Sequence, residues 1–96
     1  MDEEKICWLC NWPAFYNDPL DKHHIFGGTG RRAKSERDGL YVYLHHFKCH
    51  ESGPLAAHQN AATMQRLHEF GERKWLSDHP GATVNDFIRE YGRNYL

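Results

Sequence analysis

The pattern of apolar and polar residues predicts a pair of strands in the first half of the chain. Residues 40–44 (L-Y-V-Y-L) are aromatic or β-branched for most of their length and follow a glycine, which is typical of a strand. We expect this strand to pair antiparallel with the segment 20–24 (L-D-K-H-H), which ends in two adjacent histidines. Residues 27–39 combine glycines and charges without hydrophobic periodicity, so the pattern predicts a long loop between the strands.

The second half of the chain reads as helical. From about residue 60 to 77 apolar residues recur every three or four positions, which predicts a helix with Met64, Leu67 and Trp75 in the core. His68 is expected on the surface of this helix. Further candidate elements are an N-cap at Thr83 or Asn85, a short helix from Asp86 to Tyr91 with Phe87, Ile88 and Tyr91 facing inward, and a tail docked by Tyr95 and Leu96.

Length and composition limit the chain to one small domain, residues 1–96, with a core at about 7–60 and helices at about 60–96. Hydrophobic residues make up 40% and charged residues 26%, which is typical of a globular chain. The acidic start of the sequence and the lack of a long apolar run predict neither a signal peptide nor a membrane span, and hence a cytoplasmic protein. The formal net charge of −1 gives no argument for nucleic-acid binding.

Three cysteines and eight histidines favour metal ligation over a disulfide framework. Cys7 and Cys10 form a C-x-x-C pair, and His46 and Cys49 have the same two-residue gap. Together they predict a closed Cys3His zinc site, which would be structural. His45 is a rival fourth ligand. Two alternatives are a redox role for the C-x-x-C pair and a plain buried thiol at position 49.

The adjacent histidines His23 and His24 suggest a division of labour. Neighbouring side chains of a strand point to opposite faces, so one imidazole could hold a metal while the other acts as a base on water. The alternative is a pair of surface histidines. If Cys49 faces the zinc, His50 turns toward the first strand, and His58 follows a few residues later.

Residues 21–38, which include most of the predicted loop, have a local net charge of +2, whereas the whole chain has a formal net charge of −1. Arg31, Arg32 and Lys34 could contact phosphates there, although a solvated loop is the simpler interpretation of such a run.

The order C-x-x-C, D-K-H-H-I-F-G-G, an apolar strand and H-F-K-C-H resembles the HNH endonuclease family. The run R-x-x-K-S-E-x-x-G-L-x-V-Y-L and the ending G-R-N-Y-L make it more similar to small HNH proteins of phages and prophages. The resemblance covers roughly residues 7–96. It implies an α+β fold: a ββα-metal finger with a structural zinc and additional C-terminal helices.

By this resemblance His24 would be the general base, and His23, His50 and His58 would bind a catalytic ion. The family's middle asparagine is not visible before the strand, where Asp38 and Gly39 stand. The expected cofactors are a structural Zn²⁺ and one divalent ion. The nitrogen-rich ligands suit Mn²⁺, Ni²⁺ or Zn²⁺, and the family often uses Mg²⁺.

Two functions follow as expectations. The first is a metal-dependent DNA endonuclease or nickase, a monomer that leaves a 5′-phosphate and a 3′-hydroxyl. The second is a non-catalytic zinc-stabilised module that binds nucleic acid or a protein. One tightly held zinc fits the module, whereas zinc plus an exchangeable second ion fits the nuclease.

Overall fold

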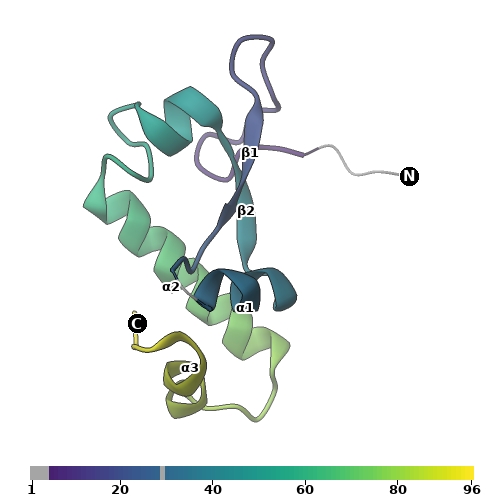
Figure 1. Cartoon of the computed structure of the whole chain (residues 1–96), viewed down its shortest axis with the longest axis vertical. Helices are drawn as coiled ribbons and strands as arrows, with labels where there is room; N and C mark the ends of the chain where they lie inside the picture. Colours follow the sequence, from purple (N-terminus) through teal and green to yellow (C-terminus); the bar gives the residue numbers. More distant parts are fainter. Residues whose placement is uncertain (1–4, 29) are drawn as a thin grey trace. The chain divides into compact units, whose positions relative to one another are not determined.

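The protein is described by a computed structural model that covers residues 5–28 and 30–96. The first four residues, on which the expectation of no signal peptide rests, and Thr29 lie outside the described residues. No helix in the described part of the chain is both long and apolar enough to cross a bilayer. The elements confirm the α+β class and follow in the order β1 (Leu20–His24), α1 (Arg31–Arg37), β2 (Tyr41–His45), the π-helical turn η1 (His46–Glu51), α2 (Ala61–Asp78) and α3 (Val84–Tyr91) (Figure 1).

The described residues form two compact units, residues 5–23 with 42–64 and residues 24–41 with 65–96. Strands β1 and β2 make a two-stranded sheet. The backbone N–H of His46 donates to the Pro19 carbonyl at 2.8 Å, and that of Ile25 donates to the Leu40 carbonyl at 3.0 Å, so the strands run antiparallel. Both predicted strands are therefore present, with the second shifted by one residue toward His45.

The segment between the strands, predicted as a loop, contains the helix α1 instead. Gly28 and Gly30 have φ angles of 96° and 81°, a left-handed conformation that suits glycine and turns the chain into the helix. Ser35 is buried, and its hydroxyl donates to the Leu40 carbonyl and accepts from the Phe26 N–H. No apolar side chain of α1 is buried, so the helix has no hydrophobic periodicity that the sequence could reveal.

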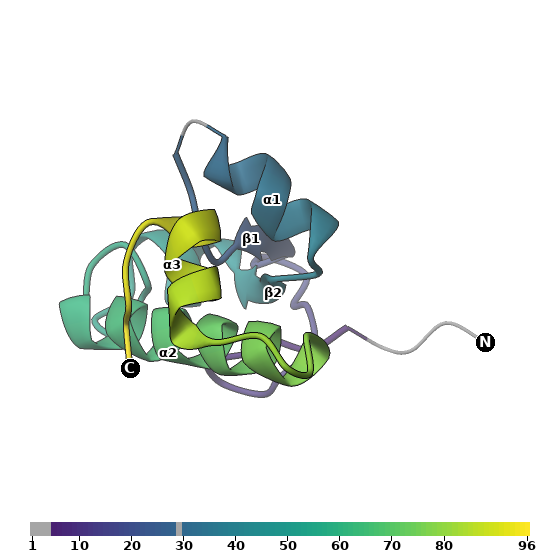
Figure 2. The same ribbon diagram turned by 90° about the horizontal axis from the view of Figure 1, so that it is seen from below.

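An aromatic core fills the second unit. The Phe26 ring lies 5.5 Å from that of Phe87, 4.7 Å from that of Tyr91 and 5.5 Å from that of Tyr95, measured between centroids. Helices α1 and α3 lie side by side (Figure 2). Between them, the ammonium group of Lys34 donates to the Glu90 carbonyl at 3.1 Å. Phe87 and Tyr91 are buried as predicted, whereas Ile88 is half-buried.

Helix α2 follows the predicted pattern with one exception. Leu67 and Trp75 are buried, and Met64 is half-buried. Gly71 lies so close to the first strand's exit that a Cβ there would come within 2.8 Å of Ile25. His68 is not on the surface as predicted but half-buried, with its ring 4.4 Å from that of Tyr95, and burial lowers the pKa of its imidazole.

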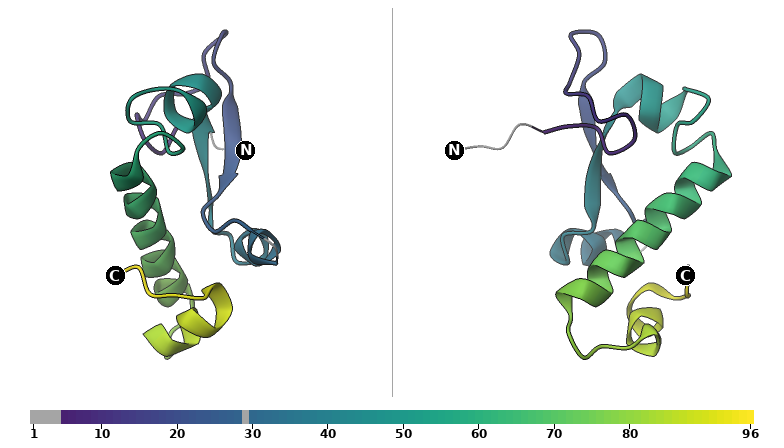
Figure 3. Two further views of the ribbon diagram at one scale, coloured as in Figure 1. Left: turned by 60° about the vertical axis from the view of Figure 1, so that its left-hand side comes forward. Right: turned by 180° about the vertical axis from the view of Figure 1, so that it is seen from behind.

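Helix α3 begins with a capping box at Thr83, which is one of the two predicted caps. The tail after α3 turns back beside α2 (Figure 3), where the Tyr95 N–H donates to the Glu72 carboxylate at 2.7 Å. Leu96 is 48% exposed, so Tyr95 alone of the two predicted residues docks the tail.

Asp38 ties together the helices of the second unit. Its carboxylate accepts hydrogen bonds from the Tyr91 hydroxyl at 2.6 Å, the Trp75 indole at 3.2 Å and the Arg37 guanidinium at 2.8 and 3.0 Å. The bonds from Arg37 lower the pKa of Asp38 below its ordinary 3.8; burial opposes this, and Tyr91 and Trp75 reinforce it. The residue at the place of the missing asparagine thus anchors the segment through its own side chain.

Replacing Asp38 with alanine is expected to destabilise the second unit by about 3 kcal/mol at neutral pH, because two largely buried donors lose their acceptor. The folded-state pKa lies below the unfolded one, so the carboxylate stabilises fully above about pH 4 and loses this effect as the pH falls through the folded value. Urea unfolding followed by tryptophan fluorescence at neutral and acid pH measures both effects.

The matched control is Asp78→Asn, which removes an exposed ion pair with Lys74 and should cost less than about 1 kcal/mol. Asp38→Asn should lose part of the stability at neutral pH and show a flatter acid profile than wild type. Equal stability of Asp38→Ala and wild type would contradict the anchoring role.

Candidate metal centres

The first unit opens with a tight turn that presents two thiols. The Asn11 N–H donates to the Cys7 carbonyl and the Cys7 N–H donates to the Trp12 carbonyl, both at 2.9 Å. Asn11 takes a positive φ of 65°, which asparagine tolerates better than most residues. The Trp8 N–H donates to the Tyr43 carbonyl at 2.8 Å, which fixes the turn on β2.

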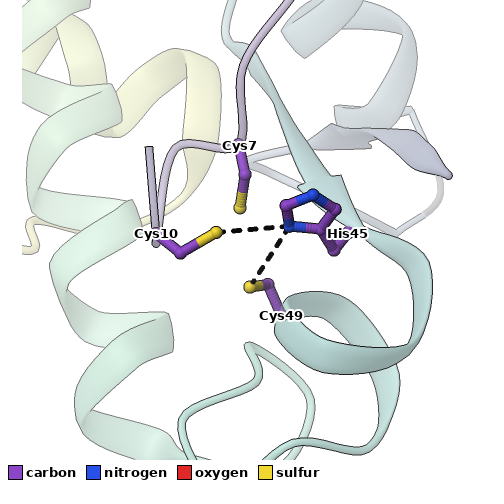
Figure 4. Close-up of side chains that lie close together, drawn as sticks. All are labelled: Cys7, Cys10, His45 and Cys49. Carbon is purple, nitrogen blue, oxygen red and sulfur yellow. Dashed lines mark hydrogen bonds between the residues drawn. The ribbon is translucent and has the colours of Figure 1, made fainter. Parts of the chain in front are cut away.

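Four ligand atoms converge at this turn: the sulfurs of Cys7, Cys10 and Cys49 and a nitrogen of His45, all within 4.8 Å of one another (Figure 4). Nδ1 of His45 lies 3.2 Å from the Cys10 sulfur and 3.9 Å from the Cys49 sulfur. Ligands of a tetrahedral zinc, at about 2.0–2.3 Å from the ion, lie roughly 3.3–3.8 Å apart. The cluster therefore has the composition and the spacing to hold a metal ion such as zinc.

The ring of His45 is oriented for this role by its outer contacts. Its Nε2 lies 2.7 Å from the Pro13 carbonyl, which accepts only, so Nε2 carries the hydrogen and Nδ1 keeps its lone pair toward the sulfurs. The Phe15 ring stacks on the imidazole at 4.6 Å with an interplanar angle of 2°. The loop between the C-x-x-C turn and β1 thus supplies both the hydrogen-bond acceptor and the cover.

The choice of His46 as the fourth ligand is corrected to His45. Strand β2 ends at His45, and Cys49 returns to it after one turn of η1, so the pairing follows a gap of three residues. His46 begins η1, and its Nδ1 lies 2.5 Å from a carboxylate oxygen of Asp21. The assumption that the second pair mirrors the C-x-x-C gap failed because a π-helical turn, not a second tight turn, carries Cys49.

The thiols interact as a cluster that would gain from a cation. Burial opposes ionisation of Cys7, but N–H groups of the turn and of β2 point at its sulfur and lower its pKa to about 7. Burial raises the pKa of Cys49 to about 12, and the neighbouring sulfurs of Cys7 and Cys10 add to this. Crowded thiols with one readily ionised member fit a thiophilic cation, which would stabilise all three as thiolates.

The three histidines predicted to bind a second ion also lie together in the first unit. Nε2 of His50 lies 3.2 Å from Nδ1 of His23 and 3.1 Å from Nε2 of His58, and the three ligand atoms fall within 4.8 Å. His23 is 8% exposed, His50 is half-buried and His58 is exposed. The expected opposite orientation of Cys49 and His50 is therefore observed, since each belongs to a different cluster.

Asp21 belongs to this neighbourhood and was missed in the sequence. Its carboxylate lies 3.1 Å from Nδ1 of His50, so that nitrogen carries the hydrogen and Nε2 is left as the ligand atom. Burial opposes ionisation of Asp21, but hydrogen bonds from His50 and His46 lower its pKa, and the same contact raises the pKa of His46. The spacing D-x-H in a strand, which puts Asp21 and His23 on one face, was the available signal.

His24 lies outside both clusters, in the second unit. Its Nε2 is 2.8 Å from a carboxylate oxygen of Glu36 on α1, and its ring centroid is 6.3 Å from that of Tyr41. The side chain of His24 is 15% exposed and that of Glu36 49%. The contact between Glu36 and His24 was not predicted, because residues 27–39 were predicted to be a loop and it is helix α1 that brings Glu36 to the strand.

The three basic residues proposed for phosphate contact lie in α1. Arg31 and Arg32 are exposed, whereas Lys34 is half-buried and paired with the Glu90 carboxylate at 3.2 Å. The guanidinium of Arg31 lies over Gly92, where an added Cβ would clash with it. Arg32 is therefore the one of the three without a fixed neighbour among the contacts found in the described residues.

Comparison of the chain with protein-family models, with curated proteins and with solved structures finds no match.

Proposed function

We propose that this chain is a metal-dependent DNA endonuclease or nickase of the HNH type, with His24 as the general base. The observation that carries the proposal is a change of role between two adjacent residues of β1. His23 joins a three-histidine cluster, and His24 joins a carboxylate instead of that cluster. This is the division between metal ligand and base that phosphodiester hydrolysis requires.

The two clusters differ in the way that structural and catalytic sites differ. The Cys3His cluster offers four protein ligands, which closes a tetrahedral site. The three-histidine cluster offers three ligands and includes the exposed side chain of His58, so positions remain for water and a phosphate oxygen. A divalent cation held there would neutralise charge on the scissile phosphate and on the leaving 3′-oxygen.

The side chains have separable tasks in this proposal. His24 takes a proton from water, and the resulting hydroxide attacks phosphorus while the bond from phosphorus to the 3′-oxygen breaks. The leaving 3′-oxygen takes a proton from solvent, which gives a 5′-phosphate and a 3′-hydroxyl. Imidazole is the side chain that most often serves as a general base in enzymes. Asp21 orients His50, and the exposed guanidinium of Arg32 is suited to a DNA phosphate.

The order of the elements supports the ββα-metal finger. His23 comes from β1, His50 from η1 and His58 from the segment between η1 and α2. The Cys3His cluster joins the C-x-x-C turn to the end of β2 and to η1. The described residues of one chain offer a single three-histidine cluster, so nicking of one strand is the expected first product.

Plasmid cleavage tests the proposal. Zinc-loaded protein is freed of exchangeable ions and assayed with supercoiled DNA after adding Mg²⁺, Mn²⁺, Ni²⁺ or Zn²⁺. Wild type should convert the DNA to nicked circles with at least one ion, and His24→Ala should lower the rate by about 10²–10⁴-fold, as expected for loss of a general base.

His79→Ala is the control, since His79 contacts Trp75 and belongs to neither metal cluster. It should cleave at the wild-type rate. If wild type cuts no duplex, branched or single-stranded DNA with any ion while binding it, the protein is the zinc-stabilised binding module instead. Equal rates for wild type and His24→Ala would reject His24 as the base.

A further inference from the structure

We propose that Glu36 is the positioning residue of the general base, a role that rests on the proposed function. A carboxylate oxygen of Glu36 lies 2.8 Å from Nε2 of His24. Eleven residues separate the two in the sequence, and Glu36 belongs to α1. Glu36 touches neither metal cluster. The bond to His24 is the contact through which we expect Glu36 to affect cleavage.

The contact decides which nitrogen of His24 is basic. A carboxylate accepts hydrogen bonds and donates none, so Nε2 carries the hydrogen and Nδ1 holds the lone pair. Nδ1 then receives the proton of the attacking water, and the positive charge that forms on the ring is stabilised by Glu36. This is the logic of a carboxylate–histidine pair, in which the acid holds the tautomer and orientation and stays ionised.

Helix α1 holds Glu36 in place through its other residues. Ser35, the neighbour of Glu36, is buried and bonds to backbone on both sides of the helix, at Phe26 and Leu40. Lys34 bonds the carbonyl and carboxylate of Glu90. Because these contacts anchor the backbone without Glu36, replacing this half-exposed side chain should leave α1 folded.

Kinetics separate positioning from a general effect on the fold. Glu36→Ala is expected to lower kcat about 10- to 100-fold, as found for carboxylates that orient functional imidazoles, with KM for DNA unchanged. The kcat of Glu36→Gln should lie between those of wild type and Glu36→Ala. Its side-chain amide can still accept from Nε2–H of His24, but it can also donate and so select the wrong tautomer. In a His24→Ala background, Glu36→Ala should change nothing further.

The control is Asp78→Ala, a carboxylate with 45% side-chain exposure that pairs with Lys74 and not with His24. It should keep the wild-type kcat. A full kcat in Glu36→Ala overturns the positioning role and leaves the proposed function standing. A further loss from Glu36→Ala in the His24→Ala background also overturns it, because Glu36 would then act by another route.

A spectroscopic measurement reads the contact without activity. Nitrogen chemical shifts of His24, measured where the imidazole is neutral, should report the Nε2–H tautomer in wild type and a mixture in Glu36→Ala. An unchanged tautomer in the variant overturns the inference. If wild type cleaves no DNA, the positioning role falls with the proposed function, while this measurement still tells whether Glu36 holds the ring.

Discussion

Removing zinc from the Cys3His cluster is expected to unfold the first unit. Its buried apolar side chains other than the ligands include Val42, Leu44, Ala56 and Ala57. Val42 and Leu44 contribute about 2 kcal/mol each, which is little against about 1–2 kcal/mol of backbone entropy for every ordered residue. Structural zinc binds with about 10–16 kcal/mol of apparent free energy and can make up this difference.

The adjacent histidines offer a matched pair for this prediction. His45→Ala should lose the zinc and the fold of the first unit, because it removes a buried ligand that also bonds the Pro13 carbonyl. His46→Ala should keep both, since His46 is 40% exposed at its side chain and contacts Asp21. Zinc content by atomic emission and amide NMR spectra of the two variants measure the difference.

The amide signals of the second unit provide the internal control. Asp38 and the aromatic core around Phe26 depend on no cysteine, so these signals should persist when zinc is removed by a strong chelator. Loss of zinc in His46→Ala together with its retention in His45→Ala would restore the ligand set with two equal gaps. Full folding after complete zinc removal would show that the cluster is not structural.

The elements whose apolar residues recur with a regular period could be predicted from the sequence. Residues 40–44 alternate toward the core, and Leu67 and Trp75 recur at helical spacing, so the strand and α2 were within reach of the sequence. Helix α1 was not, because its one buried residue is a serine and its other side chains face solvent or pair with neighbours. Its formation depends on bonds to Phe26 and Leu40, which only the tertiary structure supplies.

The candidate site shows the same division. Residue types and spacing selected Cys7, Cys10 and Cys49, and the resemblance selected the three histidines that lie together. The equal spacing wrongly favoured His46 over His45, since a shift of one residue depends on where β2 ends and how η1 winds. The roles of Asp21 and Glu36 were not predicted for a related reason. A carboxylate that orients an imidazole acts through a contact in the folded protein, and no local sequence motif indicates that contact.

Replacing His50 with alanine is expected to abolish binding of the second ion and cleavage of DNA, with zinc and fold retained. His50 is the centre of the three-histidine cluster, since its Nε2 lies about equally close to His23 and His58. Its removal leaves two imidazoles without a shared third ligand, and two neutral nitrogens hold a divalent ion weakly. His58→Ala should have a smaller effect than His50→Ala, because His58 is exposed and water can take its place.

Asp21→Asn is expected to have a smaller effect on ion binding and cleavage than His50→Ala. The amide keeps the shape of the carboxylate but releases Nδ1 of His50 from a charged acceptor, so ion affinity and cleavage should fall about 10- to 100-fold and not vanish. Manganese binding to zinc-loaded protein, followed by electron paramagnetic resonance beside nicking rates, ranks the variants. The order His50→Ala, Asp21→Asn, wild type is expected in both measurements. Wild-type ion affinity in His50→Ala would mean that the three imidazoles converge without binding a metal, and the proposed nuclease would lose its ion.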